Sequence, residues 1–137
     1  MTPTIKWAIA LLMGATIFRV QAGLFLSDLQ MFGGPAPDGW FGPWLSDTII
    51  GFLLPVMLFL FWTRRSVAVW GTLIAYNAVG AFDYSQGLIT QAISPMPVEM
   101  ASAATVHIGI GVFMCFQLLA LGLLFRRGVI AEFKGWS

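Results

Sequence analysis

Four long apolar stretches, separated by short polar segments, make up most of this 137-residue chain. They cover residues 5–26, 45–62, 67–88 and 101–125. An α-helix needs about 17–25 such residues to cross the hydrocarbon core of a bilayer. Only 9% of the residues are charged, whereas a soluble domain carries about 25%. The sequence therefore predicts an all-α integral membrane protein, a four-helix bundle in which residues 1–137 form one four-span domain.

The first stretch has a second interpretation. Lys6 precedes an apolar run, and the segment VQA before Gly23 resembles the cleavage site of a secretory signal peptide. We interpret it as a retained span.

The charges are distributed unequally about these spans. Six basic residues lie on one side: Lys6, Arg64, Arg65, Arg126, Arg127 and Lys134. Five acidic residues lie toward the other: Asp28, Asp38, Asp47, Asp83 and Glu99. Basic residues mark the cytoplasmic side of a membrane protein, so both termini are predicted to be cytoplasmic. The pattern is typical of a multi-pass protein of the bacterial inner membrane. The net charge of +1 argues against a nucleic-acid partner.

Two connections have distinctive compositions. The segment TRRS, between the second and third spans, is short enough to predict a tight helical hairpin. Residues 31–44 contain four glycines and three prolines, so we expect no regular helix there. Tryptophans are expected in the aromatic belts at the two membrane surfaces. Trp40 and Trp44 are predicted to lie in the outer belt, and the inner belt is predicted to contain Trp7, Trp62 and Trp136.

Polar side chains interrupt the apolar spans at similar depths. Arg19, Asp83 and His107 each lie about 8–11 Å below the outer helix ends, at a rise of about 1.5 Å per residue. Asp47 falls in the first turn of its predicted span, where the helix dipole favours a carboxylate. Small residues flank Arg19, Asp83 and His107 at helical spacing, which predicts that these faces point inward.

A buried charge in a membrane needs a partner, because it otherwise costs at least about 2.5–3.5 kcal/mol. We therefore expect Arg19 to pair with Asp83, and His107, Asn77 or Gln86 to add hydrogen bonds. Two interpretations remain open for this group. It is either a structural network that sets the helix register or a ligand or proton site. The candidate site residues are Arg19, Asp47, Asn77, Asp83, Gln86 and His107.

The chemistry available to such a site is restricted. The chain has no hydrolase, metalloprotease, P-loop or dinucleotide-binding motif, so no catalytic residue is assigned and an enzyme is not favoured. No cofactor is predicted. A single-histidine haem or pigment on His107 remains an alternative, whereas a haem with two histidine ligands is excluded within one chain. His107, Asp83 and Asp47 are acceptable metal ligands, but the nearby charge of Arg19 argues against a metal site.

Three groups of residues support a family resemblance. They are Asp47, Gly51 and Pro55, then Asn77, Gly80 and Asp83, and finally His107. Together they resemble a pattern found in small four-span bacterial membrane proteins of unknown function. The resemblance covers the last three spans and implies the four-span fold without an activity.

Three classes of function fit these observations. The leading hypothesis is an auxiliary or assembly subunit of a membrane complex, with protein partners in the lipid bilayer. The second is a small proton, ion or solute transporter that acts as a homo-oligomer. The third is an intramembrane enzyme or pigment-binding subunit that uses His107.

The charge distribution makes a testable prediction about orientation. Single cysteines at positions 38 and 137, in a Cys115→Ser background, should label differently in intact cells. An impermeant maleimide should modify position 38 from outside and leave position 137 unmodified until the cells are permeabilised. Labelling of position 137 from outside would show that the predicted orientation is wrong.

Overall fold

The computed structural model describes residues 1–135, and all of its regular structure in that range is helical. In chain order the elements are α1 (Pro3–Gly14), the 3₁₀ helix η1 (Ala15–Gln21), α2 (Ala22–Ser27), α3 (Leu29–Phe32), α4 (Asp38–Thr63), α5 (Val67–Ile93), α6 (Ala103–Leu124) and α7 (Arg127–Lys134). The all-α prediction is therefore confirmed.

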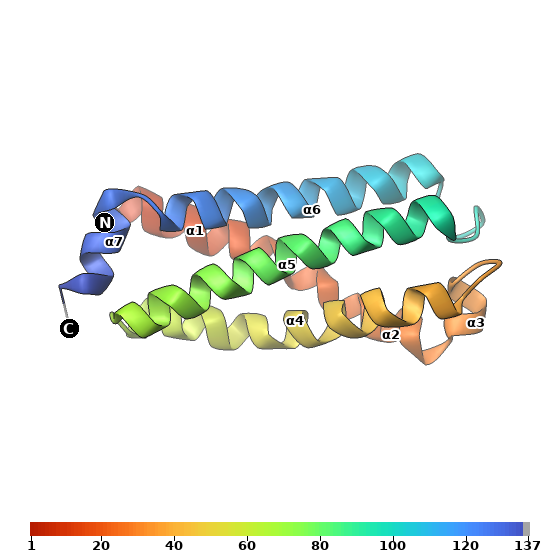
Figure 1. The fold of residues 1–137 in the computed structure, drawn as a ribbon, viewed down its shortest axis with the longest axis horizontal. Coiled ribbons are helices and arrows are strands. Elements are labelled where there is room, and N and C mark those ends of the chain that lie inside the picture. Colours follow the sequence, from red (N-terminus) through yellow and green to blue (C-terminus); the bar gives the residue numbers. More distant parts are fainter. Residues whose placement is uncertain (136–137) are drawn as a thin grey trace.

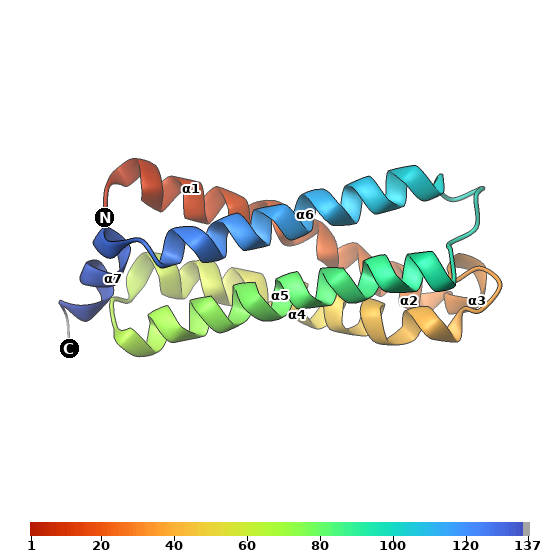
Figure 2. The same cartoon turned by 45° about the horizontal axis from the view of Figure 1, so that its top comes forward.

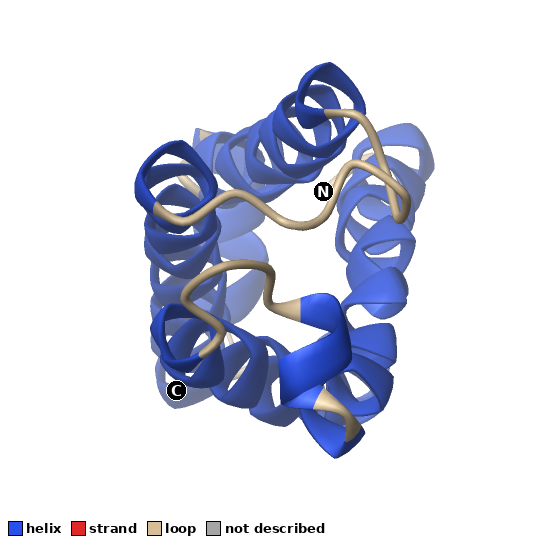
Figure 3. Cartoon of the chain, turned by 90° about the vertical axis from the view of Figure 1, so that its right-hand side faces the viewer, coloured by secondary structure: helices blue, strands red, loops and turns tan. Residues whose placement is uncertain are grey.

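The long helical elements run side by side (Figures 1 and 2). The first helical rod consists of α1, η1 and α2 in direct succession. Its beginning, α1, packs mainly against α6, whereas its end, α2, packs against α4. Between them, η1 also packs against α4, and α5 packs against both α4 and α6. The view from the end of the bundle that carries α3 shows the rods arranged around a common axis (Figure 3). The rod thus crosses from the α6 side to the α4 side along its length.

Three helical segments are long and apolar enough to cross a membrane: Pro3–Ser27, Asp38–Thr63 and Ala103–Leu124. They coincide with the first, second and fourth predicted spans. Most of their apolar side chains face outward; only 11% of the apolar window in the third segment is buried. An apolar helix that exposes an apolar surface requires a nonpolar surrounding. Helix α5 has 27 residues, enough to span, but is not among the three because its polar residues lower its hydropathy.

The prediction that residues 31–44 contain no regular helix is wrong, because α4 begins at Asp38 and continues through Pro43. Tertiary packing outweighs the local preference here. Trp40 and Trp44 are 2% and 4% exposed and stack with ring centroids 5.0 Å apart. Nε1 of Trp40 also donates a hydrogen bond of 2.7 Å to the carbonyl of Ser94, after the end of α5. The loss of one backbone hydrogen bond at a proline is offset by this burial.

The same burial corrects the aromatic belt prediction for Trp40 and Trp44, which lie inside the bundle and not at its surface. Trp7 and Trp62 are exposed and contact each other edge to face, with ring centroids 4.8 Å apart. The position of Trp136 falls outside the described residues.

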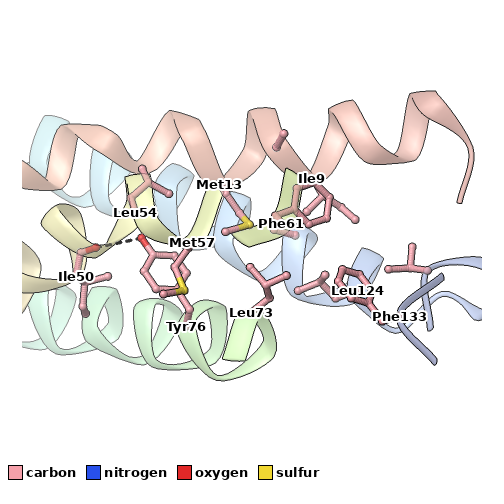
Figure 4. Packing of buried hydrophobic residues seen from close by; sticks show 13 residues of the cluster. Ile9, Met13, Ile50, Leu54, Met57, Phe61, Leu73, Tyr76, Leu124 and Phe133 are labelled. Atoms are coloured by element: carbon pink, nitrogen blue, oxygen red, sulfur yellow. Dashed lines mark hydrogen bonds between the residues drawn. The ribbon is translucent and has the colours of Figure 1, made fainter. Parts of the chain in front are cut away.

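Two apolar clusters fill the bundle interior. The larger lies toward the α7 end and includes Met13, Leu54 and Tyr76 (Figure 4). In it the Tyr76 hydroxyl donates a hydrogen bond of 3.1 Å to the Ile50 carbonyl, which ties α5 to α4. The smaller cluster lies toward the α3 end and consists of Ala22, Trp40 and Trp44. The buried charged side chains lie between these two clusters, on the first rod, on α4 and on α5.

The predicted hairpin between the second and third spans is confirmed, since α4 ends at Thr63 and α5 begins at Val67. Helix α7 packs across this end of the bundle and buries Val129 and Phe133 completely. Its Glu132 accepts hydrogen bonds from the amino-terminal ammonium at 3.1 Å and from Nε of Arg65 at 3.3 Å. These two cations, the ammonium first, lower the pKa of Glu132 below its ordinary value.

A glycine in α4 sets how closely this helix approaches η1. A Cβ atom added to Gly51 would lie 2.9 Å from Cγ1 and 3.0 Å from the backbone nitrogen of Val20. Such distances are too short for a larger residue, so the absence of a side chain brings the backbones of α4 and η1 together. That close approach brings Arg19 against α4, at 3.2 Å from the same added Cβ.

The close approach predicts that Gly51→Ala will destabilise the protein by about 1–3 kcal/mol, because the added methyl group meets backbone atoms. Gly71→Ala is the matched control, since a Cβ there meets no atom within 4 Å. It should stabilise helix α5 by about 0.5–1 kcal/mol. Reversible unfolding in sodium dodecyl sulfate measures both changes. Equal effects of the two substitutions would contradict the tight contact.

Candidate functional site

Arg19 enters the bundle from the 3₁₀ helix η1. A 3₁₀ helix has three residues per turn, so side chains three apart lie in line. Thr16, Arg19 and Ala22 follow this spacing and are all buried, at 0%, 3% and 3% exposure. The Thr16 hydroxyl donates to the Met13 carbonyl at 2.7 Å and thereby satisfies its own polarity. The change from α1 to η1 therefore aligns one inward stripe with Arg19 at its centre.

The guanidinium of Arg19 is held by two carboxylates on different helices. Its Nη1 donates to Oδ1 of Asp47 in α4 at 2.8 Å and to Oδ2 of Asp83 in α5 at 2.9 Å. Its Nη2 donates to the carbonyl of Gly80, and its Cζ lies 3.6 Å from the ring centroid of Tyr84. The predicted pair of Arg19 with Asp83 is confirmed, and Asp47 completes a triad.

Two members of this cluster were not anticipated from the sequence. The Ser46 hydroxyl donates a hydrogen bond to Oδ1 of Asp83, and the Tyr84 ring stacks on the guanidinium. Each is the sequence neighbour of one of the two aspartates. Adjacent residues of a helix lie on different faces, so the sequence does not predict that a neighbour of Asp47 or Asp83 reaches the same site. The rotation of α4 and α5 about their axes in the bundle brings Ser46 and Tyr84 there. The Gly80 carbonyl carries no sequence signal, since every residue has one.

Asp47 does not lie at a helix start. Because α4 begins at Asp38, Asp47 lies more than two turns inside the helix, so the prediction that the helix dipole stabilises it is wrong. Its stabilising partner is Arg19 instead. The side chain of Asp47 is 22% exposed, against 8% for Asp83 and 0% for Arg19.

Asn77 and Gln86 do not join the cluster. The Asn77 amide donates to the Leu73 carbonyl at 2.8 Å and accepts from Nε2 of Gln117 at 3.3 Å. This separate pair links α5 to α6 one turn away, and Gly80 makes room for it, because a Cβ there would lie 2.7 Å from the Gln117 side chain. Gln86 is half-buried on α5, and its side chain has no hydrogen bond within the described part of the chain.

His107 is also absent from the cluster. It is exposed on α6, with Nδ1 bonded at 2.7 Å to the Ala103 carbonyl of its own helix. Its small neighbours Ala103 and Ala104 are exposed as well, so the prediction that this face points inward is wrong. Because α6 is apolar all round, its periodicity does not distinguish the inner face. In residues 1–135 no three His, Cys, Asp or Glu side chains are arranged to hold a metal.

A cavity of about 280 Å³ adjoins the cluster. Arg19, Asp47 and Asp83 form its polar floor. Its aromatic lining residues are Phe18, Phe25, Trp40, Trp44, Tyr84 and Phe113. The lining residues with exposed side chains are Phe18, Gln21, Met100 and Thr105. The mouth therefore lies between η1, the first turns of α6 and the loop before it.

The crossing of the first rod accounts for this cavity. The rod contacts α6 at α1 and η1, and at α2 it packs on α4. Phe18 of η1 and Phe113 of α6 both line the cavity and contact each other, with ring centroids 5.9 Å apart. The turn after α3 lies against the loop before α6: Gly34 has a φ of +71°, and a Cβ added there would clash with the Pro95 carbonyl oxygen. Only glycine fits this contact between the two loops.

The cluster has chemical capacity that its internal contacts do not use. With both carboxylates ionised, one guanidinium faces two negative charges, so the group carries a net charge of −1. The buried Nε of Arg19 has no hydrogen-bond partner among the described residues. A buried donor without a partner is costly. The site can therefore take up one positive charge, as a proton or a ligand cation, and one acceptor atom.

Comparisons with known protein families, with curated proteins and with solved structures find no match to this chain. The resemblance to small four-span bacterial membrane proteins remains a prediction.

The triad predicts an unequal response to substitution. Arg19→Met strands two buried carboxylates and should destabilise the protein by about 3–5 kcal/mol. Asp83→Asn should cost less, because Asp47 still binds the guanidinium. The double variant should recover part of the loss, with a coupling of about 0.5–3 kcal/mol. Unfolding in sodium dodecyl sulfate measures the cycle.

His107→Gln is the control for this cycle, since an exposed side chain bonded to its own helix should change stability by less than about 0.5 kcal/mol. Additive effects of Arg19→Met and Asp83→Asn would mean that the two side chains do not interact in the folded protein.

Proposed function

We propose that this chain is a four-span membrane protein of the small-transporter class that binds a lipid-soluble solute in the cavity above Arg19, Asp47 and Asp83. In this proposal α5 is the fourth span and both termini are cytoplasmic, in the bacterial inner membrane. The observation that carries the proposal is that a cavity of about 280 Å³ is lined by the buried ionisable groups of this cluster. Ligand pockets combine mostly apolar walls with a few convergent polar groups in this way.

A purely structural network does not account for the hollow. Charges that only set helix register are stabilised best when side chains pack closely around them and exclude water. Here Asp47 is 22% exposed although it lies in the middle of a long apolar helix. Ionisable groups at membrane depth mark ligand or ion pathways in most membrane proteins, and this accessibility favours the same role here.

The position of the mouth supports entry from the bilayer. Phe18 is 59% exposed beside it, on an apolar surface that faces lipid if the rod Pro3–Ser27 spans. A solute dissolved in the bilayer then reaches the cavity sideways, without crossing the loops. The 3₁₀ helix η1 carries Arg19, lines the mouth and is the one departure from α-helical geometry within the rod. Such 3₁₀ segments often act as hinges.

A subunit role is the second candidate. His107 lies on the exposed face of α6 with a ring nitrogen already bonded at 2.7 Å to its own helix. A polar residue facing lipid is unfavourable, and contact with a helix of a second copy or a partner subunit removes that cost. This role is compatible with the first, since transporters of only four helices often act as homo-oligomers.

A cavity-filling substitution tests the proposal. A Cβ on Gly109 meets no atom within 4 Å, and Gly109 lines the cavity, so Gly109→Leu should fill the hollow without disturbing the fold. Bromobenzene, a neutral probe whose heavy atom quenches tryptophan fluorescence, should quench Trp40 and Trp44 saturably in the parent protein. Gly109→Leu should remove the saturable part and weaken the apparent affinity by at least about tenfold.

Gly122→Leu is the matched control on the same helix, since it adds the same side chain outside the cavity, where a Cβ also meets no atom within 4 Å. It should leave the saturable quenching unchanged. Quenching that never saturates in the parent protein, or that saturates equally in Gly109→Leu, would refute a solute site at this position.

A further inference from the structure

We infer that the solute is a lipid-soluble organic ammonium ion that exchanges with a proton on the Asp47–Asp83 pair. This inference rests on the proposed function. It adds that the ligand is positively charged and that its charge replaces a proton. Three independent features carry it: the charge balance of the floor, the order in which its groups are reached, and the aromatic walls.

The charge balance calls for one added positive charge. Asp47 and Asp83 both bind the same nitrogen of Arg19, at 2.8 and 2.9 Å, so the three groups act as one unit. A net charge of −1 in an apolar surrounding is unfavourable. The charged and titratable residues that line the cavity are Arg19 from η1, Asp47 from α4, and Asp83 and Tyr84 from α5. Neither α6 nor the loop before it contributes a charge to offset the excess.

The order of access places a carboxylate, and not the arginine, toward the ligand. The Asp47 side chain is 22% exposed, whereas the Arg19 side chain is fully buried. A ligand that enters the cavity meets Asp47 first. An anion is repelled there, and a neutral molecule gains no ion pair, so a cation is the ligand that this floor stabilises most.

The walls also suit a cation. Aromatic faces attract ammonium ions, most strongly where water is excluded. Trp44 lies between Phe25 and Trp40, with ring centroids 5.3 and 5.0 Å away. Phe113 stacks on Tyr84, with ring centroids 6.2 Å apart. The remaining apolar lining, such as Ile110 and Met96, accommodates the hydrocarbon part of the same ligand.

The exchange is balanced in charge. Before binding, one of the two carboxyl groups carries a proton, and the cluster is neutral. When the ammonium ion enters, that proton leaves to solvent, both carboxylates are ionised, and the ligand's charge takes its place. One cation bound thus releases one proton, and binding strengthens as the pH rises.

Two probes of the same shape and different charge test the inference. Benzyltrimethylammonium is the cation, and neopentylbenzene is its uncharged isostere. With the purified full-length protein in a maltoside detergent, both are titrated in competition with bromobenzene. The cation should bind at least about tenfold more tightly than the isostere, with an affinity that increases from pH 5 to pH 8. Calorimetry in two buffers of different ionisation enthalpy should give one proton released per cation.

Asp47→Asn separates charge from shape, because it keeps the size of the side chain. It should abolish the preference for the cation and the proton release, while the saturable binding of bromobenzene persists. Equal binding of the two isosteres, or a cation preference that survives in Asp47→Asn, would overturn the inference and leave the solute site intact. Absence of saturable bromobenzene binding in the parent protein would instead overturn the proposed function, and this inference with it.

Discussion

The burial of one arginine governs the arrangement of this bundle. An unpaired guanidinium among apolar helices costs several kcal/mol, so Arg19 requires partners from neighbouring helices. Asp47 of α4 and Asp83 of α5 bind one of its nitrogens, and the Gly80 carbonyl binds another. Because these three contacts come from two helices, they set the register of both against the first rod. Gly51 allows the backbones to come close enough for this.

The same requirement explains why the interior divides into two parts. Toward α7, large apolar side chains pack in a cluster that includes Phe61, Leu73 and Leu124, all fully buried. Toward α3, the rod has crossed to α4, and Trp40 and Trp44 fill part of the space while a cavity remains. The charged cluster lies at the boundary. One side of it is sealed by packing, and the other is open to a ligand, which is the asymmetry that a binding site needs.

Charge, access and aromatic lining are three separate properties of the site, and each favours the same ligand chemistry. The acidic excess comes from α4 and α5, the burial of Arg19 from the inward face of η1, and the aromatic walls from η1, α2, α4, α5 and α6. None depends on the others: a tighter bundle would keep the charges and lose the cavity. Their coincidence at one site favours ligand binding over a network that serves only stability. His107 is exposed on α6 and lies outside this site, so it bears on assembly and not on the ligand.

The amino-acid sequence by itself determined the helical class, the approximate helices, the hairpin at TRRS and the pairing of Arg19 with Asp83. These follow from local composition and from the cost of an isolated charge, which act wherever the chain folds. Only the tertiary structure decided which face of α6 turns inward, because a helix that is apolar all round has no periodic signal. It likewise brought Asp47 to Arg19 and Ser46 to Asp83, excluded His107 and Gln86, and extended α4 through Pro43. Those outcomes depend on side chains from other helices, whose packing energies exceed the local preferences of any one segment.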